Sequence, residues 1–173
     1  MHIAAYTSRL LNRVGFFAHN DADMLEVGNG NVTIPEARSH FALWVAMKSP
    51  LLIGTDLERL DKGLVQVLAN QYLLEFSQDG TVGESATPIM WDWTRRPEFW
   101  AGRYGDGRRL VLVVNYAEGD RRMGVSWGEV PGTTAGRRYR VTDVWTGAVA
   151  CVGRLERVLM GHDTAGWVVG GEC

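Results

Sequence analysis

The chain has 173 residues, of which 46% are hydrophobic and 22% are charged, a composition typical of a folded globular protein rather than a disordered one. The formal net charge is −2 and the basic residues are scattered apart from short doublets, so we expect no nucleic-acid partner. The sequence contains no apolar run of about 18 residues, so we also expect no membrane partner. A complete (β/α)8 barrel needs about 250 residues, so a barrel interpretation of this chain can only be partial.

The first predicted element is a short strand over the apolar residues 14–18, followed by a polar loop over residues 19–31. Residues 33–36 read Thr-Ile-Pro-Glu, which is typical of a helix start with a capping hydroxyl, an early proline and a glutamate three residues on. We therefore expect a helix after Thr33. Its apolar face, at helical spacing, contains Phe41, Trp44, Val45 and Met47.

The next predicted element is a wholly apolar strand over residues 51–54, as expected of a parallel strand that is buried on both faces. A second helix follows in this prediction. Its inward positions are Leu60, Leu64, Val67, Leu68 and Leu74. The order strand, loop, helix, strand, helix is that of an α/β protein.

The pattern changes after about residue 76. The chain has 21 glycines, above the usual share of about 7%, and most of them separate short apolar runs in this part. The predicted strands are residues 98–104, 109–116, 122–127, 138–145, 157–160 and 164–169. Residues 145–148 predict a hairpin turn, and a spacing of about ten residues between runs favours an antiparallel β-sandwich.

These patterns predict α/β plus all-β architecture in three parts. Residues 1–76 form the last two β/α units of a (β/α)8 barrel, residues 77–97 form a linker, and residues 98–173 form a C-terminal antiparallel β-sandwich domain.

The densest polar cluster in the first part lies in the loop that contains Asp21 and Asp23. Loops that follow strands form the active-site face of barrels, so these carboxylates are candidate catalytic or substrate-binding groups. The alternative is that both aspartates only bind their own backbone. A metal site with His19 is weakly indicated, because Leu25 and Glu26 break the calcium-loop pattern. We expect no metal and no cofactor.

The two cysteines, Cys151 and Cys173, leave two alternatives open. They can form one disulfide in an oxidising compartment or remain two reduced thiols.

Several motifs carry a resemblance to a known family. Residues 19–30 contain N-D-A-D-M-L-E-V-G-N, residues 38–44 contain F-A-L-W, and residues 47–54 contain K-S-P-L-L-I-G. This series resembles the later barrel region of the α-galactosidases of glycoside hydrolase family 27, and residues 139–147 are similar to runs in the tails of the fungal members. On these motifs the resemblance covers about residues 19–173, whereas residues 1–18 show no likeness to the family.

The resemblance implies a retaining exo-glycosidase that removes terminal α-linked galactose from oligosaccharides, galactolipids or galactomannans. In the family, the catalytic nucleophile follows a K-x-D pattern and the acid/base lies in a W-R-x-x-x-D pattern. Neither pattern occurs in this chain. Asp21 and Asp23 do not replace them, because adjacent loop carboxylates cannot easily flank both faces of one glycosidic bond. We therefore expect a truncated form that has no catalytic residue of its own.

The family's substrate pocket maps onto Asp23 and Met24, so the resemblance implies that Asp23 orients a sugar hydroxyl or an arginine and that Met24 forms part of the pocket wall. It also implies a galactose-containing substrate and secretion, although Arg9 and Arg13 interrupt any signal peptide. The alternative function is a non-catalytic carbohydrate-binding or interaction module. The oligomeric state stays open. We expect the apolar residues 51–53 and 41–47 to lack packing partners, and the chain to aggregate or to pair with another chain.

Overall fold

The computed structural model describes residues 6–92 and 94–173. Its helical elements are η1 (Ser8–Arg13), α2 (Ile34–Ala46), η2 (Leu57–Arg59), α3 (Lys62–Leu68) and α4 (Gln71–Ser77). Its strands are β1 (Thr87–Pro88), β2 (Phe99–Arg103), β3 (Arg109–Val114), β4 (Arg121–Ser126), β5 (Tyr139–Asp143), β6 (Val149–Val152), β7 (Arg154–Leu159) and β8 (Thr164–Glu172). Helices therefore precede an antiparallel β region, as predicted.

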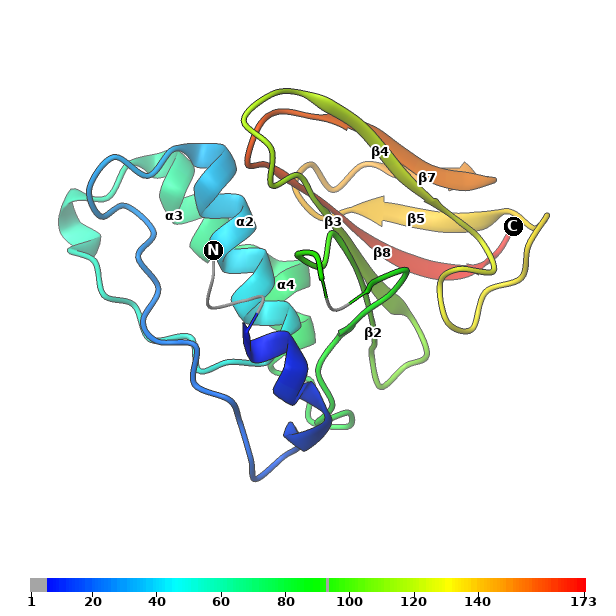
Figure 1. The fold of residues 1–173 in the computed structure, drawn as a ribbon, viewed down its shortest axis with the longest axis horizontal. Helices are drawn as coiled ribbons and strands as arrows, with labels where there is room; N and C mark the ends of the chain where they lie inside the picture. Colours follow the sequence, from blue (N-terminus) through cyan, green and yellow to red (C-terminus); the bar gives the residue numbers. More distant parts are fainter. Residues whose placement is uncertain (1–5, 93) are drawn as a thin grey trace.

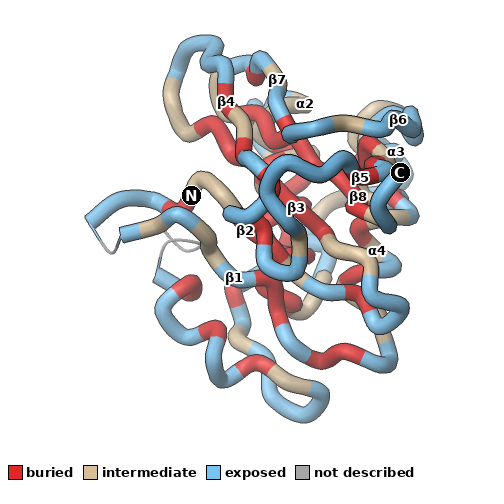
Figure 2. Tube along the Cα trace, turned by 90° about the vertical axis from the view of Figure 1, so that its right-hand side faces the viewer, coloured by how far each residue is buried: buried red, intermediate tan, exposed pale blue. Residues whose placement is uncertain are grey.

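The described residues form three layers (Figure 1). A six-stranded antiparallel sheet has the order β1-β2-β3-β8-β5-β6, and β4 pairs with β7 in a second sheet of two strands. The helices pack on one face of the larger sheet and the β4–β7 pair packs on the other. Figure 2 shows that the buried backbone follows the central strands β3 and β8.

Strand β3 shows how one sequence serves both faces of the sheet. Leu110 and Leu112 belong to the core shared with the helices, whereas Val111 and Val113 belong to the core shared with β4 and β7. Side chains alternate between the two faces of a strand, so a strand covered on both faces is apolar at every such position. Six predicted runs are confirmed as β2, β3, β4, β5, β7 and β8. Strands β1 and β6 were not predicted.

Helix α2 begins as its sequence predicts. The Thr33 hydroxyl accepts a hydrogen bond from the Glu36 amide at 3.4 Å, and the Glu36 carboxylate accepts one from the Thr33 amide at 2.9 Å. This capping box satisfies two amides of the first turn. Further along the helix, the Ser39 hydroxyl donates to the carbonyl of His162 at 2.6 Å and lies 2.6 Å from the Thr164 hydroxyl. Helix α2 is thus fixed directly to β8.

The predicted lack of partners for residues 41–47 is wrong. Phe41, Leu43 and Met47 are buried in the core that α2 shares with α3, α4 and the larger sheet. The physical reason is that the β region itself provides an apolar face, through Leu112 and Val168, against which this helix packs.

The predicted second helix is two helices. The Asn70 carboxamide oxygen accepts from the Leu73 amide at 3.1 Å and caps α4, while its amide group donates to the Val144 carbonyl at 2.7 Å. The asparagine thus ends one helical run and starts another because it has a partner in the β region, which local periodicity does not reveal.

Two predicted strands of the first part are not formed as expected. Residues 14–18 make a tight turn closed by a bridge between Gly15 and Ala18, with Phe16 and Phe17 exposed. Residues 51–54 have only one parallel bridge, between Ile53 and Leu25, and Leu52 and Ile53 are 56% and 45% exposed. A parallel strand is buried on both faces only where other elements cover both faces of its sheet, and the described residues leave Leu52 and Ile53 uncovered.

Cys151 in β6 and Cys173 after β8 form a disulfide, which resolves the alternative left open by the sequence. Strand β5 lies between β6 and β8 in the sheet, so the bond joins the edge strand to the end of the central strand. The Cys173 amide also donates to the Arg138 carbonyl at 3.1 Å.

Candidate functional site

The loop of residues 19–24 lies beside the segment of residues 48–54. The Leu25 amide donates to the Leu52 carbonyl at 2.7 Å, and the Gly54 amide donates to the Leu25 carbonyl at 3.1 Å. The loop therefore leads into a short parallel pairing of Leu25 with Ile53. The strand that the sequence predicts before the loop, over residues 14–18, is not formed.

Both aspartates of the loop use one carboxylate oxygen to shape the backbone. Asp21 Oδ1 accepts from the Asp23 amide at 2.9 Å, and Asp23 Oδ1 accepts from the Met24 amide at 2.8 Å. Asp23 has a φ of 72°, in the left-handed region that aspartate tolerates better than most residues. The alternative that each aspartate binds its own local backbone is therefore confirmed for one carboxylate oxygen of Asp21 and one of Asp23. Both side chains are exposed, and their second oxygens accept no hydrogen bond from the described residues.

Three contacts from other segments hold the loop in this shape. The Trp44 indole donates to the Asp23 carbonyl at 2.7 Å, and the Ala22 amide donates to the Ser49 hydroxyl at 2.9 Å. The His19 ring nitrogen Nδ1 donates to the Lys48 carbonyl at 3.1 Å. These partners come from α2 and from the residues that follow it, so the folded core of the helical region positions the two carboxylates.

Behind the loop, His40 stacks on Trp44 with ring centroids 4.1 Å apart. Its Nε2 accepts a hydrogen bond from the Glu26 amide at 3.3 Å, so this nitrogen carries no proton. Burial lowers the pKa of His40, which favours the same neutral ring. A neutral imidazole here acts as a fixed packing partner for the indole that binds the Asp23 carbonyl.

Met24 lies at the exposed edge of the loop, with 46% of its surface accessible. Its side chain covers Gly54, where an added Cβ would be 3.4 Å from the Met24 Cβ and 3.6 Å from its sulfur. Asp23 and Met24 are therefore adjacent, exposed and fixed from behind, which suits groups that contact a ligand.

Lys48 is a further buried charged residue near the loop. It has a φ of 49°, its ammonium group donates to the Val82 carbonyl, and it lies 5.2 Å from the centre of the Phe76 ring. Burial lowers its pKa, and the coulombic effect of Asp79 opposes this. The apolar motif after Lys48 gave no separate signal that the side chain of this lysine is buried.

The loop offers two exposed carboxylates. They can accept hydrogen bonds from hydroxyl groups or pair with a cation. Among residues 6–92 and 94–173, no cluster of three or more metal-ligating His, Cys, Asp or Glu side chains is present. In the same ranges, no helix has the length and apolar character needed to cross a membrane.

Comparison with known families assigns nearly the whole chain. Residues 2–79 match the family described as alpha galactosidase A, and residues 94–169 match the family described as alpha galactosidase C-terminal beta sandwich domain. The likeness thus begins at residue 2. The inference that residues 1–18 have no likeness to the family is therefore wrong. The likeness was missed because this stretch contains no dense motif by which to recognise it.

Curated relatives agree with this assignment. The chain is 46% identical to a probable alpha-galactosidase B of Talaromyces emersonii over 99% of its own length, and 42% identical to one of Aspergillus oryzae over its full length. It spans 42% of the length of each of these relatives.

Solved structures share the fold. The alpha-galactosidase I of Mortierella vinacea superimposes with a TM-score of 0.85 at 22% identity, over 94% of this chain and 42% of that one. A putative alpha-galactosidase/melibiase of Bacteroides fragilis gives a TM-score of 0.85 at 25% identity, over 98% of this chain and 38% of that one. The three-layer arrangement is therefore that of the C-terminal region of these proteins.

Proposed function

Because the chain belongs to the α-galactosidases of glycoside hydrolase family 27, we propose that it is the C-terminal part of a retaining α-galactosidase. The full enzyme removes terminal α-linked galactose from oligosaccharides, galactolipids or galactomannans, and both catalytic aspartates lie in sequence that this chain does not contain. The observation that carries the proposal is the 46% identity to an alpha-galactosidase B over 99% of the chain.

In this proposal the chain contributes one wall of the galactose pocket. The free oxygen of Asp23 accepts a hydrogen bond from a sugar hydroxyl or from an arginine beside the sugar, and Met24 contacts the apolar face of the ring. The support comes from the exposure of both side chains and from the indole of Trp44, which fixes the Asp23 backbone. We retain the division into residues 1–76, 77–97 and 98–173 as part of the same proposal.

The proposal is tested by complementation. The chain alone should not hydrolyse a chromogenic α-galactoside, and clear turnover by the chain alone would contradict the proposal. Adding the part of the Talaromyces emersonii relative that the chain does not cover should produce hydrolysis, since that part would supply the remaining barrel strands and both aspartates.

The role of Asp23 is tested in the reconstituted enzyme. Asp23→Ala should lower kcat/KM about 10- to 100-fold, because a hydrogen bond to a charged group contributes about 1.5–3 kcal/mol. The matched control is Asp56→Ala, which removes an exposed aspartate that caps η2. Equal activity of the Asp23 and Asp56 variants would refute a substrate-binding role for Asp23.

We also propose that the protein is secreted. Disulfides persist mainly in oxidising compartments, and the Cys151–Cys173 bond supports this location. Titration of the denatured, unreduced protein purified from its native source should find no free thiol, and two titratable thiols would contradict the proposal.

A further inference from the structure

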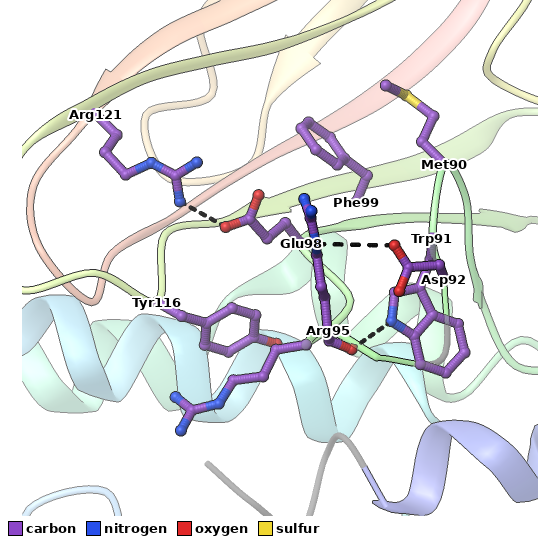
Figure 3. Close-up of a pocket in the computed structure, with 9 residues that line it drawn as sticks. Met90, Trp91, Asp92, Arg95, Glu98, Phe99, Tyr116 and Arg121 are labelled. Carbon is purple, nitrogen blue, oxygen red and sulfur yellow. Dashed lines mark hydrogen bonds and ion pairs between the residues drawn. The ribbon is translucent and has the colours of Figure 1, made fainter.

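A second candidate site lies in the β region and shares no residue with the loop of residues 19–24. It is a pocket of about 320 Å³ between the segment before β2 and the ends of β3 and β4 (Figure 3). Pockets that bind small molecules start at about 300 Å³, so this one has room for a small ligand.

Three aromatic side chains from different segments line the pocket. Trp91 precedes β2, Phe99 begins β2, and Tyr116 follows β3. All three are partly exposed. Most other described tryptophans are buried in the two cores, namely Trp44, Trp100, Trp127 and Trp167. Among the described tryptophans, Trp91 and Trp145 are the ones that are partly exposed, and Trp91 lines this pocket.

Hydrogen bonds fix two of these rings before any ligand arrives. The Trp91 indole donates to the Arg95 carbonyl at 2.6 Å, and the Tyr116 hydroxyl donates to the Pro97 carbonyl at 3.2 Å. Fixed aromatic rings provide large apolar contact area and lose little conformational entropy on binding. The pocket is therefore preorganised for a ligand with an apolar face.

The polar groups of the pocket are of both signs. Arg95 pairs with Asp92 at 3.8 Å, and Arg121 pairs with Glu98 at 2.5 Å, as the dashed lines in Figure 3 show. The Arg96 guanidinium lies 5.6 Å from the centre of the Tyr116 ring. Guanidinium donors and carboxylate acceptors therefore lie beside the aromatic rings. Asp92 and Glu98 neutralise two of the three arginine charges of the lining, which weakens its attraction for a strongly anionic ligand.

A pyranose matches this combination, because one face of the ring presents C–H groups and its rim presents hydroxyls that both donate and accept. We propose that this pocket binds a neutral pyranose of a glycan chain, with the sugar ring against the aromatic side chains of the lining and its hydroxyls on the charged groups. The site requires no hydrolysis, so the inference goes beyond the proposed α-galactosidase function.

The test is saturation-transfer NMR on the whole 173-residue chain, because this method detects the ligand and tolerates a protein that self-associates. The probes are galactose and mannotriose, with glucuronate as the anionic comparator. We expect saturable transfer from the chain to at least one neutral sugar and weaker transfer to glucuronate. Absence of saturable binding to both neutral sugars up to about 10 mM, or binding of glucuronate alone, would overturn the proposal.

Variants locate the binding in this pocket. Trp91→Ala should weaken sugar binding about tenfold through loss of the stacking surface. Arg96→Ala removes an exposed side chain and should weaken binding several-fold, so it tests the pocket even if the tryptophan variant unfolds. The matched control is Arg103→Ala on β2, an exposed arginine outside the pocket that pairs with Glu84. Equal binding by the Arg96 and Arg103 variants would overturn the assignment. The measurement uses the chain alone, so failed complementation would not affect it.

Discussion

The helical region of residues 6–79 and the strand region of residues 87–173 bury their apolar side chains in different ways. The strand region has a core of its own, in which Val125 and Leu155 of the small sheet pack on Trp167 of the large sheet. The core of the helical region instead combines Phe41 of α2 with strand residues of the large sheet. Outside this core, the helical region leaves Phe17, Leu52 and Ile53 exposed, and these residues are called its outer side below.

This difference indicates that the helical region depends on the strand region for its core more than the strand region depends on the helical region. The strand region closes one core with its own residues, whereas the helical region needs the large sheet to bury α2. The exposed residues are separated in sequence and lie on the part that carries Asp23 and Met24. The helical region therefore has a buried inner side, which packs on the large sheet, and an outer side with exposed apolar side chains.

The largest expected effect comes from two phenylalanines of the helical region. Phe41→Ala should lower the free energy of unfolding by about 3–5 kcal/mol, because it leaves a cavity in the shared core. Phe17→Ala, at a fully exposed position, should change it by less than about 0.5 kcal/mol. Urea unfolding measures both. Similar losses for the two variants would break the contrast between inner and outer sides.

The next effect concerns the strand region alone. Removal of the Cys151–Cys173 bond by the double substitution to serine should lower the free energy of unfolding by about 3 kcal/mol, given a sequence separation of 22 residues. Thermal unfolding with and without a reductant measures the change. The reductant should affect the parent protein and leave the double variant unchanged. A reductant effect on the variant would mean that the bond is not the cause.

A smaller effect is expected at the start of α2. Thr33→Ala removes the capping hydroxyl and should cost about 1 kcal/mol in urea unfolding. Thr33→Ser retains a hydroxyl and serves as the control, with little loss expected. If alanine and serine are equally tolerated, the capping box contributes nothing to the helical region.

The pH dependence of stability tests the same capping box, and we expect a smaller change in the free energy of unfolding than for Thr33→Ala. Hydrogen bonds from the Thr33 backbone and side chain lower the pKa of Glu36. The carboxylate therefore stabilises the fold above its ordinary pKa, and this contribution is lost as the pH falls through the lowered value. Glu36→Gln should be less stable than the parent near pH 7 and closer to it near pH 3. A constant difference across this range would contradict the assignment.

The smallest effect on stability, but a clear one on association, is expected at the outer side. Leu52→Ser should leave the unfolding free energy within about 0.5 kcal/mol of the parent, because the side chain is 56% exposed. It should reduce self-association in light scattering. The control is Met160→Ser, at an exposed position in the strand region. An equal reduction by the control would remove the distinction between the two regions.

Local signals allowed much of this fold to be predicted. The capping box at Thr33 involves only neighbouring residues, and the strands have apolar runs bounded by turns. Residues 51–54 show the limit, because an apolar run does not state how many neighbours it will have. The break at Asn70 had only a local signal, since asparagine is a preferred N-cap residue and caps the Leu73 amide; its bond to Val144, 74 residues away, had none.

The candidate site shows the same limit. Asp23 and Met24 were found through the resemblance of their loop to a family, and the alternative role of Asp21 as a backbone-binding residue followed from its type. The supports of the loop were not predicted, because the bonds from Trp44 and Ser49 to the loop exist only in the folded chain. The aromatic pocket at Trp91 had only a general signal, the tryptophan content, which mostly reflects core packing.

The order of the large sheet has a consequence for synthesis of the protein. Strand β8 lies between β3 and β5, yet it is the last of these strands to leave the ribosome. Until it emerges, the β2–β3 and β5–β6 pairs have no strand to join them, and α2 has no Thr164 hydroxyl to bind Ser39. A nascent chain halted before residue 164 would therefore expose two unpaired strand edges, so this region is expected to depend on chaperones until translation passes that point.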